Sequence, residues 1–425
     1  MKKYITKLLI LFIVLAMLCG CAQQTDTTLS PGSSGQAQTG TTVSAAVTPS
    51  PSGSDSNFQG QNSADTTGNT ANNSSSAPEI TQSAPPTPSF TPANTPTPKP
   101  TPTPEPTPTP EPTSKPITGT SQKYDYQQLQ TDIDLLSSMY PDKITVSSIG
   151  TSHFNRDIPL IILGNPSAAK RVLIHGAMHA REYITSQVIM LTLERYLRNY
   201  DTLTYNGVKY SDILSQVAIY IVPMVNPDGV ELVNNGIDSV PEGYRDTVLK
   251  INKNSTNFSQ WKANGLGVDL NNNYGILGSI DGKNYASVPA SMGFPGEGAF
   301  SEPETIAIAD LTSEMDFLST ASYHTKGEII YWYFGQTGED ETRDLAYARE
   351  LAKLTDYSLV SKNGSSVNNL AMGYKDWFVL AFNRPGFTIE CGQGSHPLKV
   401  SQLDSIYQAV RYVPIHMAWR EYEAG

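Results

Sequence analysis

The segment HGAMHARE, residues 175–182, places a histidine three positions before a glutamate. In this H-x-x-E spacing, His179 and Glu182 can offer an imidazole and a carboxylate to one zinc ion from the same turn of the chain. A catalytic zinc site uses three protein ligands and leaves one position open for water. The candidate for the third ligand is His324 in ASYHTKGE, at the end of a predicted strand, and its alternative role is that of a structural histidine.

A hydrolytic zinc site also needs a general base beside the bound water. Glu390 closes the apolar run PGFTIE, so a strand there would carry its carboxylate to the rim of a sheet, where a raised pKa is expected. A polar residue that simply caps the end of a strand would explain its position equally well.

These side chains need a scaffold, and apolar residues at helical spacing predict helices over residues 126–140 and 184–197, the first of which Pro141 ends. Short apolar runs rich in β-branched residues predict strands at residues 144–149, 158–163, 172–175 and 217–224. Because the runs are continuous rather than alternating, they favour an α/β fold with a mixed, largely parallel central sheet flanked by helices. Ligands of such folds gather where strands end.

The second half of the chain continues this pattern. Ser301 with Glu304 three residues later predicts a capping box at the start of a helix, and Pro303 suits its first turn. Apolar runs predict strands at residues 317–324, 328–333 and 386–390, and a single helix at residues 401–421.

Together these features resemble the zinc carboxypeptidase family, the carboxypeptidase A-like metallopeptidases, along residues 122–425. The matching motifs follow one order: Tyr126, Asn155-Arg156, H-x-x-E, Asn226-Pro227-Asp228-Gly229, Asp269-Leu270-Asn271, Ser301-Glu302-Pro303-Glu304, His324 and the strand of Glu390. The resemblance implies one Zn²⁺ ion bound by His179, Glu182 and His324. It also implies that Glu390 takes a proton from the attacking water and returns it to the departing amine.

The resemblance implies roles for three further basic residues. The family stabilises the developing oxyanion with an arginine in a W-R-K-N segment, and Lys262 stands at that position in WKAN; its alternative role is a solvated loop lysine. Arg181, inside the H-x-x-E motif, matches a substrate-binding position. His175 matches no zinc ligand of the family, so we expect it to be a packing histidine.

Two departures concern the substrate. The family holds a terminal carboxylate with an Asn-Arg pair in D-x-N-R-N, whereas here Asn271 is retained and Asn272 replaces the arginine. A neutral amide cannot act as a charged bidentate clamp. Counting back from Glu390 places Lys375 at the base of the specificity pocket, where a cation favours a carboxylate-bearing residue. The same count puts Asn368 where the family has a mobile tyrosine, and Tyr374 is near but not aligned.

These departures resemble the bacterial branch that cleaves γ-D-glutamyl bonds to diaminopimelate in cell-wall peptides, which makes peptidoglycan stem peptides the expected substrate. One alternative is a general extracellular carboxypeptidase that trims ordinary peptides. A second alternative, from another class, is a non-catalytic module that uses an inherited peptidase fold to bind wall fragments.

The N-terminal region predicts export. Lys2, Lys3 and Lys7 precede the uncharged apolar run of residues 8–20, and Leu18-Cys19-Gly20-Cys21 resembles the lipobox of bacterial lipoproteins with Cys21 acylated. An ordinary signal peptide, and hence secretion, is the alternative. Residues 22–121, rich in Ser, Thr and Pro, predict a disordered linker that would hold the catalytic domain of residues 122–425 away from the membrane.

Composition excludes some classes of protein. Of the 3 cysteines only Cys391 lies within residues 122–425, so no disulfide can form inside the domain. The formal net charge of -11 argues against a surface that binds nucleic acid.

Overall fold

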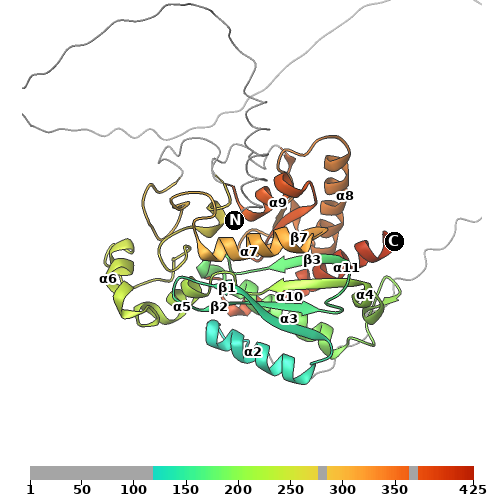
Figure 1. The fold of residues 1–425 in the computed structure, drawn as a ribbon, viewed down its shortest axis with the longest axis horizontal. Helices are drawn as coiled ribbons and strands as arrows, with labels where there is room; N and C mark the ends of the chain where they lie inside the picture. The colour runs from blue at the N-terminus through green and yellow to red at the C-terminus, as the bar shows by residue number, and fades with distance from the viewer. Residues whose placement is uncertain (1–117, 276–284, 363–371) are drawn as a thin grey trace, which may run out of the picture. The chain divides into compact units, whose positions relative to one another are not determined.

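The computed structural model describes residues 118–275, 285–362 and 372–425, all of which belong to the unit Pro104–Gly425 (Figure 1). The predicted signal segment, Cys21, residues 22–117 of the predicted linker, and Asn368 lie outside the described residues. Within these ranges no helix is both long enough and apolar enough to cross a bilayer.

The described chain contains both strands and helices, and most of the strands belong to one central sheet. The strands of the central sheet are β1 (Ile144–Thr151), β2 (Asp157–Leu163), β3 (Lys170–His175), β6 (Val217–Val222), β7 (Ser319–His324), β8 (Ile329–Tyr331), β9 (Ser358–Leu359) and β10 (Gly386–Glu390). The α-helices are α2 (Tyr126–Met139), α3 (Ile184–Arg198), α4 (Tyr210–Gln216), α5 (Pro227–Asn235), α6 (Glu242–Ile251), α7 (Pro303–Met315), α8 (Gly338–Thr355), α9 (Tyr374–Phe382), α10 (Leu403–Val410) and α11 (Val413–Glu423). Strands β4 (Thr204–Tyr205) and β5 (Val208–Lys209) form a separate hairpin.

The central sheet has the strand order β1-β2-β6-β3-β7-β10-β8-β9. Its middle strands β6, β3, β7 and β10 are parallel to one another, whereas β1, β2 and β8 join antiparallel neighbours. The predicted mixed, largely parallel sheet flanked by helices is therefore confirmed. The carboxyl ends of β3, β7 and β10 meet at one edge of the sheet, where ligands of such folds gather.

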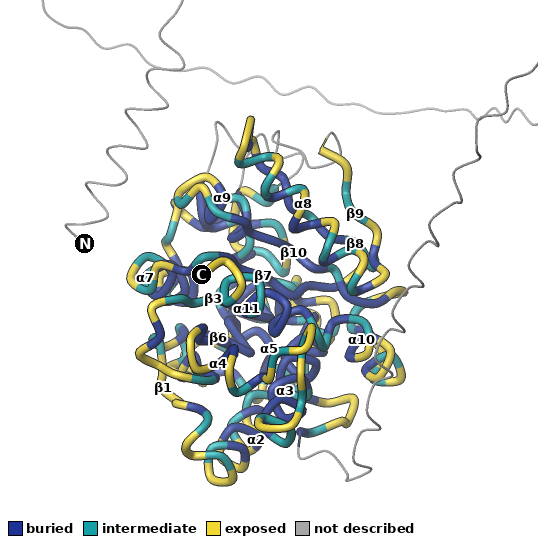
Figure 2. The backbone as a smooth tube through the Cα atoms, turned by 90° about the vertical axis from the view of Figure 1, so that its right-hand side faces the viewer, coloured by how far each residue is buried: buried dark blue, intermediate teal, exposed yellow. Residues whose placement is uncertain are grey.

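Successive residues of the middle strands point to opposite helical layers. Ile174 of β3 packs in a cluster with α3 and α11, whereas its neighbour Leu173 packs with α7 and α9. Figure 1 shows α2 and α3 on one side of the sheet and α7 and α9 on the other. Figure 2 shows that the middle of the sheet and α3 are largely buried, whereas the edge strand β1 is largely exposed. Since both faces are covered, the strands read as continuous apolar runs in the sequence.

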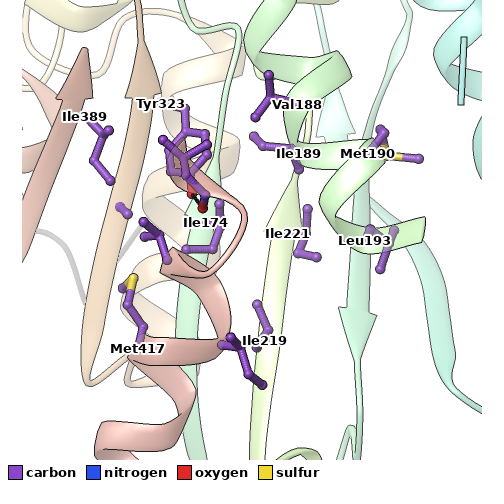
Figure 3. Close-up of a cluster of buried hydrophobic side chains, with 14 of the residues drawn as sticks. Ile174, Val188, Ile189, Met190, Leu193, Ile219, Ile221, Tyr323, Ile389 and Met417 are labelled. Atoms are coloured by element: carbon purple, nitrogen blue, oxygen red, sulfur yellow. Dashed lines mark hydrogen bonds between the residues drawn. The ribbon is translucent and has the colours of Figure 1, made fainter. Parts of the chain in front are cut away.

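The core on the α3 face makes the fold sensitive to cavities. Ile174 is 1% exposed and lies among Ile189, Ile221 and Tyr323 (Figure 3). We expect Ile174→Ala to lower the free energy of unfolding by ~2–5 kcal/mol and Ile174→Val by only ~0.5–1.5 kcal/mol. Chemical unfolding of both variants measures the difference; equal losses would show that this site is not closely packed.

Two local predictions are wrong. Instead of one helix over residues 401–421, the chain forms α10 and α11, and Pro414 lies in the first turn of α11. Because proline lacks an N–H group, a continuous helix would lose a hydrogen bond there. The capping box also does not form: Glu302 is the residue before α7, and no side chain caps that end. Glu304 is instead buried in another polar network, described below.

The amino-terminal edge of the domain is held by carboxylates. The backbone N–H of Thr118 donates to Glu194 Oε2 at 2.9 Å, and that of Gly119 donates to Asp132 Oδ2 at 2.9 Å. Contacts with the domain therefore include Thr118, the first described residue, which lies four residues before the Gln122 boundary chosen from composition.

Candidate active site

His179, Glu182 and His324 converge in one buried cluster. His179 Nδ1 lies 3.0 Å from Glu182 Oε1 and 3.0 Å from His324 Nδ1. His324 Nδ1 lies 3.1 Å from Glu182 Oε2. The three groups are close enough together to hold a metal ion.

The chemistry of this donor set fits zinc. Two imidazole nitrogens and a carboxylate are zinc ligands, and at tetrahedral zinc such atoms are about 3.3 Å apart, close to the separations observed. Two histidine Nδ1 atoms facing each other at 3.0 Å repel as lone pairs unless a proton or a cation lies between them. Burial opposes ionisation of Glu182, but His179 and His324 hold the pKa of its carboxyl well below the usual range.

Local contacts explain how the chain after β3 presents these ligands. Glu182 is the last residue of the short 3-10 helix η1 (Ala180–Glu182). The Thr185 hydroxyl donates to Glu182 O and accepts from Ala177 N, and so links the end of η1 to the chain before it. Asn226 Nδ2 donates to Met178 O at 3.1 Å and thereby ties the same loop to α5. Any Cβ at Gly229 would lie 2.7 Å from Ala180 Cβ, so the close approach of α5 requires glycine.

Parallel pairing of β7 with β10 brings His324 and Glu390 together. The two residues are register partners at the carboxyl ends of their strands. Burial raises the pKa of Glu390 to about 7; His324 and Lys262 oppose this rise, and Glu182 adds to it. A carboxylate with such a pKa, directly beside the metal cluster, has the properties of a general base.

Lys262 is joined to the cluster through Asp269. Its Nζ donates to Asp269 Oδ2 at 2.9 Å, and Asp269 Oδ1 is 3.2 Å from His179 Nε2. Burial alone would lower the pKa of Lys262, but Asp269 and Glu182 more than offset it, so the net shift is upward. Burial likewise opposes ionisation of Asp269, yet Lys262 and His179 hold its pKa well below the usual range. Asp269 therefore connects the candidate oxyanion cation to a candidate zinc ligand.

This bridge yields a prediction for metal affinity. Carboxylates that orient a metal-binding histidine contribute about 10–100-fold to affinity. We expect Asp269→Asn to weaken zinc binding by that factor, because the amide cannot hold the His179 ring as a carboxylate does. Competition with a chromogenic chelator measures the affinity, with Asp404→Asn at an exposed position as the control. Unchanged affinity in Asp269→Asn would refute this role.

The predicted substrate-binding amides and lysine lie around the start of α9. Asn271 Oδ1 accepts from Tyr374 N at 3.0 Å, while Asn272 is partly exposed at the end of the 3-10 helix η3 (Leu270–Asn272). Lys375 is 7% exposed; its Nζ donates to Tyr333 O at 3.0 Å and forms an ion pair with Asp376. Tyr374 is fully buried and hydrogen-bonds Thr312 Oγ1, so it cannot serve as a mobile tyrosine.

The other residues of the HGAMHARE motif separate into two environments. Arg181 is partly exposed beside the cluster and donates from Nη1 to Gln260 O at 3.1 Å. His175 is buried as the last residue of β3, and its Nε2 lies 2.7 Å from Ser322 Oγ. Burial lowers the pKa of His175 to about 3, which keeps it neutral. As expected, His175 packs in the core and takes no part in the cluster.

A second polar cluster supports the loop that carries Lys262 and Asp269. Asn264 Nδ2 donates to Glu302 Oε2 at 2.8 Å and to Glu304 Oε2 at 3.3 Å, and His153 Nε2 lies 2.8 Å from Glu302 Oε2. Asn264 Oδ1 accepts from Val268 N within the loop itself. This network orders the backbone between the two active-site residues.

Three residues near the site were not assigned roles from the sequence. Asp269 occurs in a matched motif, but its contact with His179 depends on folding. Asp376 adjoins Lys375 in sequence, yet their ion pair had to be seen in the structure. His396 carried no motif at all, and its Nε2 is 3.8 Å from Glu182 Oε1.

Comparison with known proteins agrees with this geometry. A family model of zinc carboxypeptidases matches residues 129–412. A gamma-D-glutamyl-L-diamino acid endopeptidase of Lysinibacillus sphaericus is 38% identical over 288 residues, which cover 68% of this chain and 70% of the relative. An uncharacterized protein of Bacillus subtilis (strain 168) is 31% identical over 287 residues, 67% of this chain and 74% of its own.

A solved structure shows the same fold. Thrombin activatable fibrinolysis inhibitor superposes with a TM-score of 0.57 at 20% sequence identity, covering 72% of this chain and 77% of its own. The sequence and fold together place the chain in the zinc carboxypeptidase family. It is therefore a zinc metallopeptidase.

Proposed function

We propose that this metallopeptidase hydrolyses the γ-D-glutamyl bond to diaminopimelate in cell-wall peptides, with zinc held by His179, Glu182 and His324. The observation that carries the proposal is the 38% identity, across most of the domain, to a relative named as a gamma-D-glutamyl-L-diamino acid endopeptidase. Two residues that would bind the substrate also support the proposal. Asn272 stands where the family has the arginine that binds a terminal carboxylate, and Lys375 places a buried cation in the specificity pocket.

The proposed mechanism assigns each step to a residue of the chain. Bound zinc supplies a Lewis acid and a water of lowered pKa. Glu390 would accept a proton from the attacking water as the water oxygen bonds to the scissile carbonyl carbon, and would return that proton to the amine nitrogen as the C–N bond breaks. Lys262, held protonated by Asp269, donates to the oxygen of the scissile carbonyl as negative charge develops there. Asn271 and Asn272 are assigned to binding of the departing residue.

The ion pair at the start of α9 suits the end of a diaminopimelate side chain. That side chain carries both an ammonium and a carboxylate, and Asp376 and Lys375 offer the opposite charges. An ammonium has three N–H donors, of which Lys375 uses two, on Tyr333 O and Asp376. One donor remains for a substrate carboxylate. The aromatic ring of Phe334, 5.6 Å from Lys375 Nζ, contributes an apolar side.

We expect Lys375→Met to remove the preference for diaminopimelate over lysine, which lacks the terminal carboxylate. A charge-assisted hydrogen bond contributes about 1.5–3 kcal/mol, or roughly 10–100-fold in kcat/KM. The test compares γ-D-glutamyl-diaminopimelate with γ-D-glutamyl-lysine peptides, using Lys353→Met at an exposed position of α8 as the control. If the ratio were the same in wild type and Lys375→Met, the pocket assignment would be wrong.

The general carboxypeptidase remains the rival function. It predicts release of single residues from ordinary peptides with free C-termini, and no requirement for a γ-linkage. The non-catalytic binding module is opposed by membership of a zinc peptidase family together with the convergence of three potential ligands beside Glu390.

We also propose that the enzyme works outside the cytoplasm, anchored by lipid at Cys21 and extended on the linker toward the wall. The lysines, apolar run and small residues before Cys21 support this proposal. Metabolic labelling with a fatty acid should mark the wild-type protein and not Cys21→Ser. Labelling of neither, with the protein found in the medium, would favour secretion.

A further inference from the structure

Two basic residues lie in the segments that carry the candidate metal ligands and are at least partly exposed. Arg181 lies between the candidate ligands His179 and Glu182 in η1 and is partly exposed. His324 is the last residue of β7, and Lys326, two residues further along the chain, is exposed. Each cation is therefore placed beside the cluster by the same backbone that places a ligand.

A chain of hydrogen bonds gathers the loops that carry these two residues. Arg181 Nη1 donates to Gln260 O at 3.1 Å, and Gln260 Nε2 donates to His396 O at 2.6 Å. His396 Nε2 lies 2.9 Å from Thr325 O, and Thr325 N donates to Glu182 Oε2 at 3.1 Å. The loops of Arg181 and Lys326 are thus held on either side of His396, next to Glu182.

These two cations differ from the two lysines deeper in the site in having no carboxylate partner among the described residues. Lys262 is paired with Asp269, and Lys375 with Asp376. Within residues 118–275, 285–362 and 372–425, neither Arg181 nor Lys326 has a carboxylate oxygen within 4.0 Å of a side-chain nitrogen. Arg181 Nε is also shielded from solvent without a hydrogen-bond partner.

We propose that Arg181 and Lys326 form an anion subsite for the α-carboxylate of the D-glutamyl residue on the acyl side of the scissile bond. This inference rests on the proposed function. In a γ-linkage the bond is made by the side-chain carboxyl, so the α-carboxylate stays free, three carbon atoms from the scissile carbonyl. Among ordinary α-linked residues only glutamate has a carboxylate at the same distance from the scissile carbonyl, so the subsite would select a glutamyl residue on the acyl side. His396 positions the two loops through its contacts with Gln260 and Thr325.

The subsite is separate from the pocket of the leaving residue. Lys375 contacts Tyr333, Phe334 and Asp376, whereas Arg181 and Lys326 belong to the loops joined by Gln260 and His396. Changes at Arg181 and Lys326 should therefore alter recognition of the acyl residue and leave the preference for diaminopimelate over lysine unaltered.

The test uses two peptides that differ in one group: γ-D-glutamyl-diaminopimelate with a free α-carboxylate, and the same peptide with an α-carboxamide. We expect wild type to favour the carboxylate by roughly 10–100-fold in kcat/KM, the range of a charge-assisted contact. Arg181→Gln and Lys326→Gln should each reduce this ratio, and the double variant should bring it near one. Lys326→Glu should shift the preference toward the carboxamide. Zinc content and melting temperature, measured on every variant, separate these effects from metal loss or unfolding.

The outcomes are distinguishable from failure of the proposed function. If wild type cleaved neither peptide, the proposed function would fail and the subsite with it. If wild type cleaved both peptides equally well, or if the double variant kept the wild-type ratio, the subsite would be wrong while the proposed function stood. Lys353→Gln serves as the matched control and should keep the wild-type ratio.

Discussion

Replacement of Glu390 by glutamine is expected to lower kcat by about 10²–10⁴-fold, the range contributed by a positioned general base. Glutamine keeps the shape of the side chain but cannot accept the proton of the attacking water. Glu390 is not one of the three grouped ligands, so bound zinc should remain. Steady-state kinetics together with metal analysis of the same sample measure both effects, and Glu314→Gln on the exposed side of α7 is the control.

The pH dependence of the wild-type enzyme adds a second measurement of the same role. The base acts only when it is deprotonated, so kcat/KM should fall as pH drops through the pKa of Glu390. Burial raises this pKa to about 7, and the charge of a bound divalent cation lowers it. The acid limb should therefore lie below pH 7 and vanish in Glu390→Gln. A Glu390→Gln enzyme with normal activity would contradict the assignment.

His324→Ala should weaken zinc binding by about 10²–10³-fold and abolish activity at ordinary zinc concentrations. Zinc bound by four ligands gains about 10–16 kcal/mol, so one ligand accounts for roughly 2.5–4 kcal/mol. The loss should be larger than for Asp269→Asn, since His324 itself donates a nitrogen. Chelator competition measures the affinity directly, and excess zinc should restore part of the activity.

His175 supplies a matched control for that experiment, because it is also a buried histidine at the end of a strand. We expect His175→Gln to lower stability by breaking its contact with Ser322 while zinc affinity is retained. Retained affinity in His324→Ala combined with lost affinity in His175→Gln would reverse the two assignments.

The site residues that the sequence predicted are either close together in the chain or located at the ends of predicted strands. His179 and Glu182 lie in one short turn, so their proximity follows from H-x-x-E alone. His324 and Glu390 are far apart in the chain, and their meeting required the expectation that both end parallel strands of one sheet. The helix of residues 184–197 and the strand of Glu390 were likewise predicted to within a residue.

What the sequence could not predict depends on side chains from separate loops. The bridge from Lys262 through Asp269 to His179 and the contact of His396 with Thr325 arise only when the loops pack together. The capping box failed for a similar reason, because burial beside Asn264 and Glu302 outweighed the local preference of Glu304. The break between α10 and α11 was readable from Pro414, whose missing N–H group opposes a continuous helix.

Under the proposed function, the substrate would distinguish this protein from a general carboxypeptidase of the same family. Asn272 removes the charged clamp for a free C-terminus, and Lys375 with Asp376 offers a charge pair to the leaving residue. If Arg181 and Lys326 bind the acyl residue as proposed, recognition of the substrate depends on charge on both sides of the scissile bond.

Mass spectrometry of a defined stem peptide tests the central claim most directly. The substrate is L-Ala-γ-D-Glu-diaminopimelate-D-Ala, incubated with wild-type enzyme and with Glu390→Gln as the blank. The account predicts L-Ala-D-Glu and diaminopimelate-D-Ala from the wild type, with one water added across the bond, and neither product from the blank. Release of D-Ala alone with the γ-D-glutamyl bond intact, or no cleavage by the zinc-loaded enzyme, would contradict it.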